Sequence, residues 1–306
     1  MGHSTVIVSG ADATFFPLLR QAIQSLLGAG LGEEAQIGVL DQGLSPEQVR
    51  WLSGLGCRVV QAQWDIDVPL TQRTRAQVGL VARTALRDYF PGFEVYVWFD
   101  ADAWVQTREF FELMVAGAQR HGAALVRENG YGYRRHALYS RWWYGHMMVQ
   151  CGPWRGLTIA RKPSINIGVM ALAATAPHWG RWREQYVQFI ARSGKLNLDQ
   201  HAFNAAVHLH DLPHALLPAR CNWIPRLSVP AWSARTQRLH EPGGEALSVI
   251  HLAGSDKGRR YALASTDGAR VQTPLSYDAL QRLRDGVPTP ALATREAGWR
   301  RQGKVA

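Results

Sequence analysis

The sequence predicts an α/β protein whose central sheet is mostly parallel and doubly wound, with helices on both of its faces. The first half of the chain alternates short apolar runs with stretches of helical spacing, which is typical of βαβ units. One run of β-branched and aromatic residues, Val95–Phe99, is typical of a strand buried on both faces. The chain has 306 residues, which could form one large α/β domain or two smaller ones, and its 46% hydrophobic content is ample for a core.

The predicted elements follow one another in the order that a doubly wound sheet requires. Short apolar runs rich in β-branched residues indicate strands at 5–9, 37–40, 58–60, 95–99, 123–126 and 247–250. Apolar residues spaced three or four apart indicate helices at 15–27, from Pro46 onward, at 73–87 and at 108–120. Four later aromatic residues share one helical stripe, which favours core packing. They are Trp179, Trp182, Tyr186 and Phe189.

Helical spacing fails between residues 128 and 163, where aromatic residues are crowded among arginines. The aromatic residues are Tyr131, Tyr133, Tyr139, Trp142, Trp143, Tyr144 and Trp154. This stretch predicts a long loop or a small helical insertion beside the functional site, because long irregular segments in compact domains are usually functional. Aromatic faces suit sugar binding and favour an acceptor site here, although the same rings could close a small satellite core.

A net charge of +10 indicates a negatively charged partner, and nucleic acid, an anionic membrane and a phosphorylated substrate all fit it. A nucleic-acid-binding module would require the arginines to gather on one stripe with stacking aromatics. The sequence does not establish that arrangement, so we expect no nucleic-acid partner. Near the C-terminus, basic residues surround one tryptophan, which suits peripheral contact with anionic headgroups, whereas a solvated, frayed end is the alternative. These residues are Arg295, Trp299, Arg300, Arg301 and Lys304.

The chain lacks the sequence signals of membrane insertion and export. No apolar run approaches the ~18 residues of a membrane span, and the N-terminus lacks the pattern of a secretory signal. We therefore expect a cytoplasmic protein, with the inner face of the membrane as a peripheral location. The three cysteines, Cys57, Cys151 and Cys221, are widely spaced and are expected to be reduced thiols.

The predicted strand at 95–99 ends in two carboxylates separated by one residue, Asp100 and Asp102. Ligands of open α/β sheets bind just beyond the carboxyl ends of the strands, so the acids lie where a site is expected. Mg²⁺ and Mn²⁺ take oxygen ligands and commonly share their coordination sphere with phosphates, which indicates a nucleotide or diphosphate substrate. In the alternative interpretation, Asp100 caps a turn and Asp102 is solvated.

Together with the acid pair, several further segments in the same order resemble the retaining sugar-nucleotide transferases of glycosyltransferase family 8. The likeness spans roughly residues 5 to 260, and ordered matches are more specific than a single motif. It implies a nucleotide-sugar transferase domain of the GT-A type over residues 1–270. Residues 128–163 are then an aromatic and basic insertion near the acceptor site, and residues 271–306 form a C-terminal helix and a basic tail.

The segment from Val8 to Phe15 is similar to the family's first strand and base-binding turn. The resemblance implies that Ala11, Asp12 and Thr14 contact the nucleotide, with Asp12 meeting the uracil. Farther along the chain, the acid pair and the residue between them are implied to contribute to the same nucleotide-sugar site, through Asp100 and Ala101.

Arg83 stands where the family has a helical arginine that contacts the diphosphate and the donor sugar. Arginine suits this role because its planar donors pair with phosphate oxygens. Without the resemblance, a solvated helical arginine would be the favoured interpretation.

Two further segments resemble parts of the family that hold the donor sugar. Asn166 and Gly168 lie in an Asn-x-Gly-Val segment, in which the asparagine reaches the sugar and the glycine allows close approach. Asp199 and Gln200 resemble the family's Asp-Gln pair, in which the acid binds sugar hydroxyls and the amide lies near the anomeric carbon. Alone, these segments would be an ordinary turn and a helix N-cap. His201 follows, where many members have another acid.

The last matching segment has the family's spacing His-x-x-Gly-x-x-Lys, in His251, Gly254 and Lys257. The resemblance implies that the histidine is the third metal ligand, that the glycine admits the diphosphate and that the lysine neutralises it. These residue types suit the chemistry, because imidazole binds Mn²⁺ well and glycine lets the backbone approach a phosphate. The family usually continues with proline and an aromatic residue, where this chain has Gly258 and Arg259.

The resemblance implies a metal-dependent, retaining transferase that moves galactose or glucose from a UDP-sugar to a saccharide or glycolipid acceptor. Lipopolysaccharide or another cell-surface glycan is the expected product. The implied metal is Mn²⁺, with Mg²⁺ as the second option, held by Asp100, Asp102 and His251. The implied catalytic residues are Gln200, Asp199, Arg83 and Lys257.

Two other functions stay open at this point. A catalytically silent relative that binds glycans or nucleotide sugars fits the changes at His201 and after Lys257. A nucleotidyltransferase could use a related sheet, but it would normally have a Gly-rich, basic loop after the first strand, which residues 11–15 do not provide.

Overall fold

The computed structural model describes residues 3–68, 73–128, 137–265, 268 and 270–287. The strands are β1 (Thr5–Ala11), β2 (Gln36–Asp41), β3 (Arg58–Gln61), β4 (Val95–Phe99), β5 (Ala103–Val105), β6 (Ala123–Arg127), β7 (Ile165–Ala173), β8 (Ala215–Leu217), β9 (Ala231–Ser233), β10 (Arg238–His240), β11 (Val249–His251), β12 (Arg260–Ala264) and β13 (Arg270–Pro274). The α-helices are α1 (Phe16–Gly28), α2 (Pro46–Gly54), α3 (Arg75–Ala82), α4 (Leu86–Tyr89), α5 (Glu109–His121), α6 (Ala137–Cys151), α7 (Pro153–Ala160), α8 (His178–Ser193), α9 (Asp199–Leu209) and α10 (Tyr277–Arg284). Short 3₁₀ helices are η1 (Leu31–Glu33), η3 (Arg83–Ala85), η4 (Ala219–Asn222) and η5 (Gly254–Asp256).

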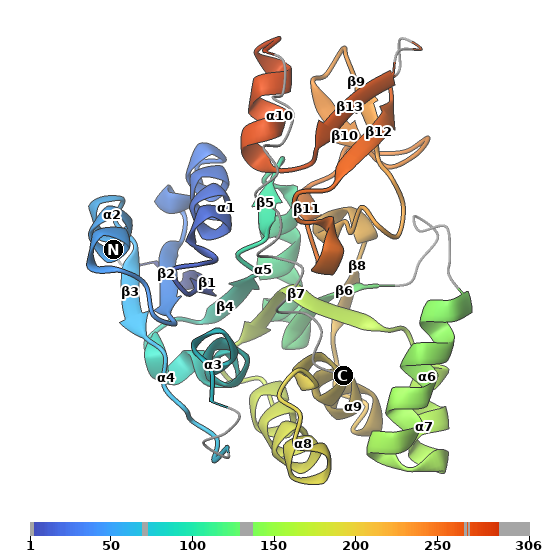
Figure 1. Cartoon of the computed structure of the whole chain (residues 1–306). Helices are drawn as coiled ribbons and strands as arrows, with labels where there is room; N and C mark the ends of the chain where they lie inside the picture. The colour runs from blue at the N-terminus through green and yellow to red at the C-terminus, as the bar shows by residue number, and fades with distance from the viewer. Residues whose placement is uncertain (1–2, 69–72, 129–136, 266–267, 269, 288–306) are drawn as a thin grey trace.

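A seven-stranded sheet in the order β3-β2-β1-β4-β7-β6-β8 forms the centre of the molecule (Figure 1). Neighbouring strands are parallel, except that β7 runs antiparallel to both β4 and β6. The predicted α/β class with a mostly parallel, doubly wound sheet is confirmed. The strand order reverses direction between β1 and β4, and their carboxyl ends border the crevice in which such sheets bind ligands.

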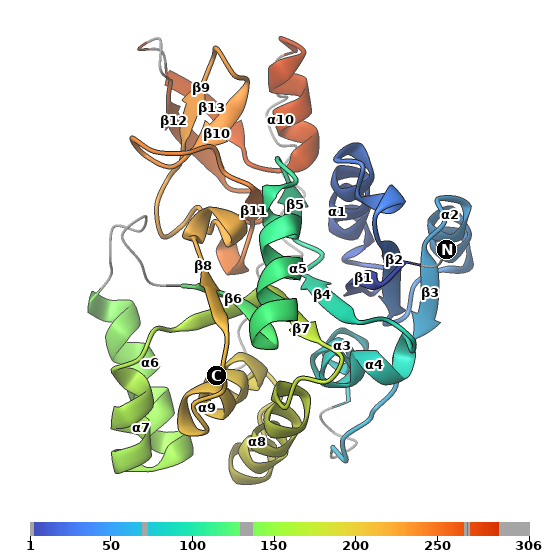
Figure 2. The ribbon, with the colours of Figure 1, turned by 180° about the vertical axis from the view of Figure 1, so that it is seen from behind.

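Helices cover both faces of this sheet, and each face has its own hydrophobic core. In Figure 1, α3 and α8 lie in front of the sheet, where they pack with residues such as Val6 and Trp98. On the other face, which Figure 2 shows, α1 and α5 pack with residues such as Ile7 and Val97. Neighbouring residues of one strand thus serve opposite cores, as the two-residue period of a strand requires.

The aromatic stripe of α8 belongs to the first of these cores. Its members, Trp179, Trp182, Tyr186 and Phe189, are all buried, which confirms the predicted packing role. The indole N–H of Trp182 donates to the carbonyl oxygen of Asp199 at 3.0 Å. The stripe therefore also holds the first residue of α9, where the sequence predicts part of the site.

The segment between β6 and β7 is helical where the structure describes it. α6 and α7 pack against each other and against α9, and Trp143, Met147 and Ile159 are buried in the core that α8 shares. These residues fit the predicted small helical insertion. Tyr131 and Tyr133 lie outside the described residues, and acceptor binding by this segment stays a prediction.

The predicted helix over 73–87 is divided in the structure. α3 ends at Ala82, the chain tightens into η3, and α4 follows. Ala85 departs from helical geometry, with φ −126° and ψ 27°. The tightened turn begins at Arg83, whose side chain is buried, so tertiary contacts decide the backbone here although the helical spacing continues.

A third core lies beside the sheet, where β9, β10, β12, β13 and α10 gather at the top of Figure 1. Trp104 and Trp223 are buried in it, and β11 pairs antiparallel with β5. Through this pairing, β11 lies beside β5, the strand that follows the acid pair. The predicted basic tail at 294–304 lies outside the described residues. Across the described ranges, each helix is too short or too polar to span a lipid bilayer.

Candidate active site

The two acids predicted as metal ligands lie in the turn that joins β4 to β5. β4 ends at Phe99, and β5 begins at Ala103, which pairs with His251 of β11. His251 Nε2 consequently lies 3.3 Å from Asp102 Oδ1 and 3.5 Å from Asp100 Oδ2. One possible ligand atom from each of the three side chains lies within 4.8 Å of the other two. Two carboxylates and an imidazole form a donor set that suits Mn²⁺.

Gly168 of β7 leaves room beside these side chains. Its carbonyl oxygen accepts a hydrogen bond from the Asp100 N–H at 2.7 Å, so β7 passes directly along the acid pair. A Cβ atom at Gly168 would lie 2.2 Å from His251 Cε1 and 2.8 Å from Asp100 Oδ2, closer than real side chains allow. The backbone therefore requires glycine here, and the three donor side chains fit a divalent cation.

The two carboxylates have opposite pKa shifts. Burial raises the pKa of Asp100; Arg83 opposes this effect, and the neighbouring Asp102 adds to it. Burial would also raise the pKa of Asp102, but Lys257 and His251 outweigh it and hold this pKa below its usual range. Lys257 forms an ion pair with Asp102. Asp102 is thus the more persistent anion of the pair.

Arg83 reaches the site from η3 and is buried. Its guanidinium carbon lies 5.7 Å and 5.9 Å from the ring centroids of Trp98 and Trp182. It forms an ion pair with Asp199 at the start of α9 and lies 3.6 Å from Asp100 Oδ1. Aromatic faces and carboxylates compensate for the lost hydration of the guanidinium, so a fixed positive charge lies beside the acid pair.

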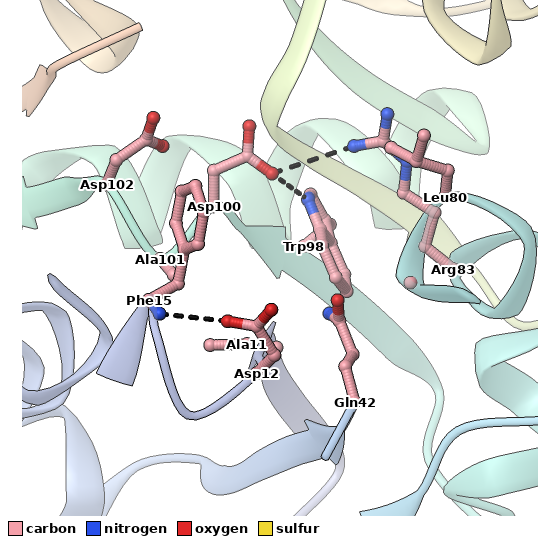
Figure 3. Close-up of a pocket in the computed structure, with 12 residues that line it drawn as sticks. Ala11, Asp12, Phe15, Gln42, Leu80, Arg83, Trp98, Asp100, Ala101 and Asp102 are labelled. Carbon is pink, nitrogen blue, oxygen red and sulfur yellow. Dashed lines mark hydrogen bonds and ion pairs between the residues drawn. The ribbon is translucent and has the colours of Figure 1, made fainter. Parts of the chain in front are cut away.

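A cleft opens beyond β1 and β4, and the acid pair contributes to its wall (Figure 3). The cleft is lined by Gly10, Ala11, Asp12, Phe15, Gln42, Gly79, Leu80, Arg83, Trp98, Asp100, Ala101 and Asp102. Asp12 Oδ1 accepts hydrogen bonds from the N–H groups of Thr14 and Phe15, at 3.0 and 2.9 Å, which fixes the turn after β1. Most of the predicted nucleotide-contacting residues therefore share this cleft, whereas Thr14 is exposed and does not line it.

Gln42 is a cleft residue that the predicted site does not include. A Cβ atom would lie 2.7 Å from Gln42 Nε2 if added at Gly10, and 2.3 Å if added at Gly79. The two glycines thus leave space for this amide between β1 and α3. A glycine inside a predicted helix was the sequence signal that could have indicated a close approach at Gly79.

Asn166 and Gln200, both predicted to reach the donor sugar, contact each other. Asn166 Nδ2 donates to Gln200 Oε1 at 3.3 Å, and Gln200 Nε2 donates to Glu128 Oε2 at 3.0 Å. Asn222 Nδ2 donates to Asn166 Oδ1 at 2.9 Å, and Asn222 Oδ1 lies 2.9 Å from His251 Nδ1. Glu128 and Asn222 are buried members of this network, and neither stands in a motif that the sequence makes recognisable.

Gly254 and Lys257 lie in the turn that follows β11. Gly254 has φ +61°, which favours glycine, and a Cβ atom there would lie 2.5 Å from Arg226 Nη1. Arg226 donates to the carbonyl oxygen of Ala253 at 2.8 Å, and its Nη2 lies 3.9 Å from Glu128 Oε1. Arg226 is thus a further cation beside the predicted site, without a sequence pattern that indicates it.

The sequence matches no protein-family model and no curated protein. The structure, in contrast, matches a crystal structure of the galactosyltransferase LgtC in complex with donor and acceptor sugar analogs. The match has a TM-score of 0.54 and 15% identity, and it covers 94% of this chain and 97% of that chain. This chain has the GT-A glycosyltransferase fold.

Two other solved structures support the same fold. The apo structure of the bifunctional glycosyltransferase WbbM matches with a TM-score of 0.55 and 13% identity, over 83% of this chain and 46% of that one. Mouse xyloside xylosyltransferase 1, in its apo form, matches with a TM-score of 0.52 and 15% identity, over 85% and 99%. At these identities the matches show the fold, whereas function depends on the residues of the site.

Proposed function

We propose that this protein is a metal-dependent, retaining glycosyltransferase of family 8 that transfers galactose or glucose from a UDP-sugar to a saccharide acceptor. The observation that carries the proposal is the cluster of Asp100, Asp102 and His251, with ligand atoms within 4.8 Å of one another. It lies at the reversal of the strand order, where sheets of this kind bind ligands. The fold shared with LgtC supports the same reaction class.

The metal that we propose is Mn²⁺, with Mg²⁺ as the alternative. Both accept carboxylate oxygens, and the imidazole of His251 favours Mn²⁺ over the harder Mg²⁺. Bound there, a divalent cation would act as a Lewis acid on the diphosphate of the donor. Asp102 is already held as an anion by Lys257, so a ligand oxygen is available without deprotonation at neutral pH.

The chain's own cations act on the leaving group. Lys257, beside the glycine turn at Gly254, supplies a point charge for the diphosphate, and Arg83 supplies a rigid, planar one. Together they stabilise the negative charge that develops on the departing UDP. Asp12 binds the uracil, with Ala11 and Thr14 contributing to the base-binding turn.

We assign Asp199, Gln200 and Asn166 to the sugar of the donor, with Ala101 beside its diphosphate. The bond between the anomeric carbon and the phosphate oxygen breaks, and its electron pair leaves with UDP. The acceptor hydroxyl forms the new bond on the same face of the sugar, and its proton passes to the leaving phosphate oxygen. Gln200 lies near the anomeric carbon, and its neutral amide supports a partial positive charge without becoming a covalent nucleophile.

The acceptor that we propose is a saccharide or glycolipid of lipopolysaccharide or another cell-surface glycan. We place residues 128–163 beside this acceptor, within a transferase unit of residues 1–270. Residues 271–306 form a C-terminal helix and a basic tail, and the tail contacts anionic lipids at the inner face of the membrane. If so, removal of the residues after Pro290 reduces sedimentation with anionic vesicles and leaves UDP-sugar hydrolysis unchanged. Equal vesicle binding by the shortened protein would reject the membrane contact.

The first experiment is calorimetry of UDP binding with and without Mn²⁺, followed by a panel of UDP-sugars in which UDP release is measured. We expect Mn²⁺-dependent binding, and release from UDP-galactose or UDP-glucose. Binding without release from any sugar or acceptor would favour a silent nucleotide-sugar-binding relative. No UDP binding in either condition would reject the transferase.

A further inference from the structure

The buried asparagine Asn222 contacts the metal-binding histidine on the ring edge that faces away from the acids. Asn222 Oδ1 lies 2.9 Å from His251 Nδ1, while Nε2 of the same ring lies 3.3 Å from Asp102 Oδ1. We propose that Asn222 is a positioning residue that keeps a proton on His251 Nδ1, so that Nε2 is the ring nitrogen that binds a metal ion at the acid pair. The inference rests on the proposed function, because it concerns the proposed metal ligand.

The direction of each hydrogen bond follows from one backbone group whose polarity is certain. The Gly168 N–H donates to Asn166 Oδ1 at 2.8 Å, so the oxygen of that amide is identified. The group of Asn222 that contacts the same oxygen at 2.9 Å must be its NH₂. The other end of the Asn222 amide is then an oxygen, and the His251 Nδ1 facing it must carry the hydrogen.

The hydrogen bonds at the other end of this network, near Glu128, run in the same direction. Glu128 is buried, and its carboxylate accepts hydrogen bonds, so the Gln200 atom 3.0 Å away is the donor Nε2. Gln200 Oε1 then accepts from Asn166 Nδ2 at 3.3 Å. Two independent ends, a backbone N–H and a carboxylate, thus require the same orientation of Asn166. Reversal of one side-chain amide in this network would place two donors or two acceptors against each other.

The backbone holds Asn222 rigidly against β11. Asn222 ends η4, and the next residue, Trp223, donates to the carbonyl of Val249 at 2.9 Å and accepts from the His251 N–H at 2.8 Å. The Trp223 side chain is fully buried, and its indole N–H donates to Ser228 O at 2.9 Å. The amide therefore reaches His251 from a paired and packed segment, which a ligand-orienting group requires.

The arrangement divides the two functions of the Asn222 amide. Its oxygen accepts from His251 and serves the metal ligand, whereas its NH₂ donates to Asn166 and serves the network of Gln200. A leucine removes both contacts with little change in volume. An aspartate retains an acceptor for His251 but loses the donor to Asn166, so the two variants separate the functions.

The test measures the dissociation constant of Mn²⁺ without nucleotide, from the electron paramagnetic resonance signal of the free ion. We expect Asn222→Leu to weaken Mn²⁺ binding by about 10- to 100-fold, as is usual for groups that orient a metal ligand. Asn222→Asp should bind Mn²⁺ at least as tightly as the wild type, yet hydrolyse the UDP-sugar about tenfold more slowly.

The matched control is Asn204→Leu. Asn204 is also a buried asparagine, but its amide bonds the backbones of Ile165 and Gln200 rather than a metal ligand, so Mn²⁺ affinity should be unchanged. If Asn222→Leu fails to fold, Asn222→Asp and the wild type decide. In the Mg²⁺-loaded wild type, long-range ¹H–¹⁵N spectra should show His251 protonated on Nδ1, with the signal assigned by its loss in His251→Ala.

The outcomes separate this inference from the proposed function. A wild type that binds Mn²⁺, with Asn222→Leu binding it equally well, overturns the positioning role alone. His251 protonated on Nε2 in the Mg²⁺ form overturns it too. A wild type that binds neither ion rejects the metal site, and with it both proposals.

Discussion

The site has an acidic end and an amide end, and they are held in different ways. The acidic end consists of Asp100, Asp102, His251 and Lys257. The amide end consists of Glu128, Asn166, Gln200 and Asn222. At the acidic end, burial raises the pKa of Asp100, whereas Lys257 and His251 lower that of Asp102. Each contact at the amide end instead needs one donor and one acceptor. Charge attraction falls slowly with distance, but hydrogen bonds depend on direction, so the amide end is the more precisely oriented of the two.

The largest effect is expected from a substitution at the acidic end. Asp102→Asn removes a ligand and leaves Lys257 without its anion, so Mn²⁺-dependent UDP binding should weaken at least ~100-fold, which corresponds to about 3 kcal/mol. Calorimetry with and without Mn²⁺ measures the change. Asp211→Asn, an exposed aspartate outside the site, is the control and should bind as the wild type does. If UDP binding by Asp102→Asn depends on Mn²⁺ as strongly as in the wild type, Asp102 is not a metal ligand.

The second prediction concerns Gly168, which contacts both ends. In Gly168→Ala the added methyl group would lie 2.2 Å from His251 Cε1, so the imidazole must move. We expect Mn²⁺ affinity to fall by about 10- to 100-fold, while circular dichroism still reports a folded protein. Gly180→Ala, at a helical glycine with open space around it, is the matched control. Wild-type Mn²⁺ affinity in Gly168→Ala would mean that the site does not depend on this close approach.

A third variant tests whether the amide end acts apart from the metal. Glu128 accepts hydrogen bonds from Gln200, Asn166 and Ser164, and Glu128→Gln replaces one acceptor oxygen with a donor that must face another donor. We expect kcat for UDP-sugar turnover to fall about tenfold, with the dissociation constant of Mn²⁺ unchanged. Glu112→Gln, on the exposed surface of α5, should change neither. Equal losses of kcat and Mn²⁺ affinity in Glu128→Gln would show that the two ends are not separable.

The last prediction concerns stability rather than binding or turnover, and it separates pH effects of the whole fold from those of the acidic end. His178 is fully buried, and burial, with a smaller contribution from His214, lowers its pKa from 6.5 to about 4. The unfolded chain therefore binds a proton that the folded chain does not, and stability falls as pH drops from 6.5 toward 4. His178→Phe should remove about 2 kcal/mol of this loss.

Urea unfolding at pH 7 and pH 4.5 measures that difference within each protein, so any change in packing at neutral pH cancels. The variant should lose less stability between the two pH values than the wild type loses. If both proteins lose the same amount, His178 is not a source of the acid sensitivity. Mn²⁺ affinity at pH 7 should be equal in the two proteins.

The sequence predicts the acidic end better than the amide end, for a physical reason. Asp100 and Asp102 follow a buried strand, so local order along the chain indicates them. His251 and Lys257 stand at a spacing that the resemblance to glycosyltransferase family 8 makes recognisable. Their closeness then follows from the antiparallel pairing of β5 with β11. The sheet could be predicted in the same way, because its strands and helices alternate with clear periods.

The amide end depends on contacts between distant parts of the chain. Glu128 and Gln200 are 72 residues apart, and Asn222 and Asn166 are 56 apart. A single asparagine or glutamate carries no periodic signal, so its partner becomes apparent only in the folded chain. The break at Arg83 has the same cause: the helical spacing continues through it, and burial between two tryptophans overrides that spacing.

The reversed direction of β7 has a consequence for how this fold can diverge. Because β7 runs against β4 and β6, its first residues lie at the same edge at which those two strands end. The chain between β6 and β7 thus leaves and returns beside the site, carrying α6 and α7 with it. Evolution can therefore lengthen, shorten or replace the segment between β6 and β7 without moving the strands of the sheet. Because of the reversed strand, the segment that borders the site can change in evolution while the site residues on the strands stay the same.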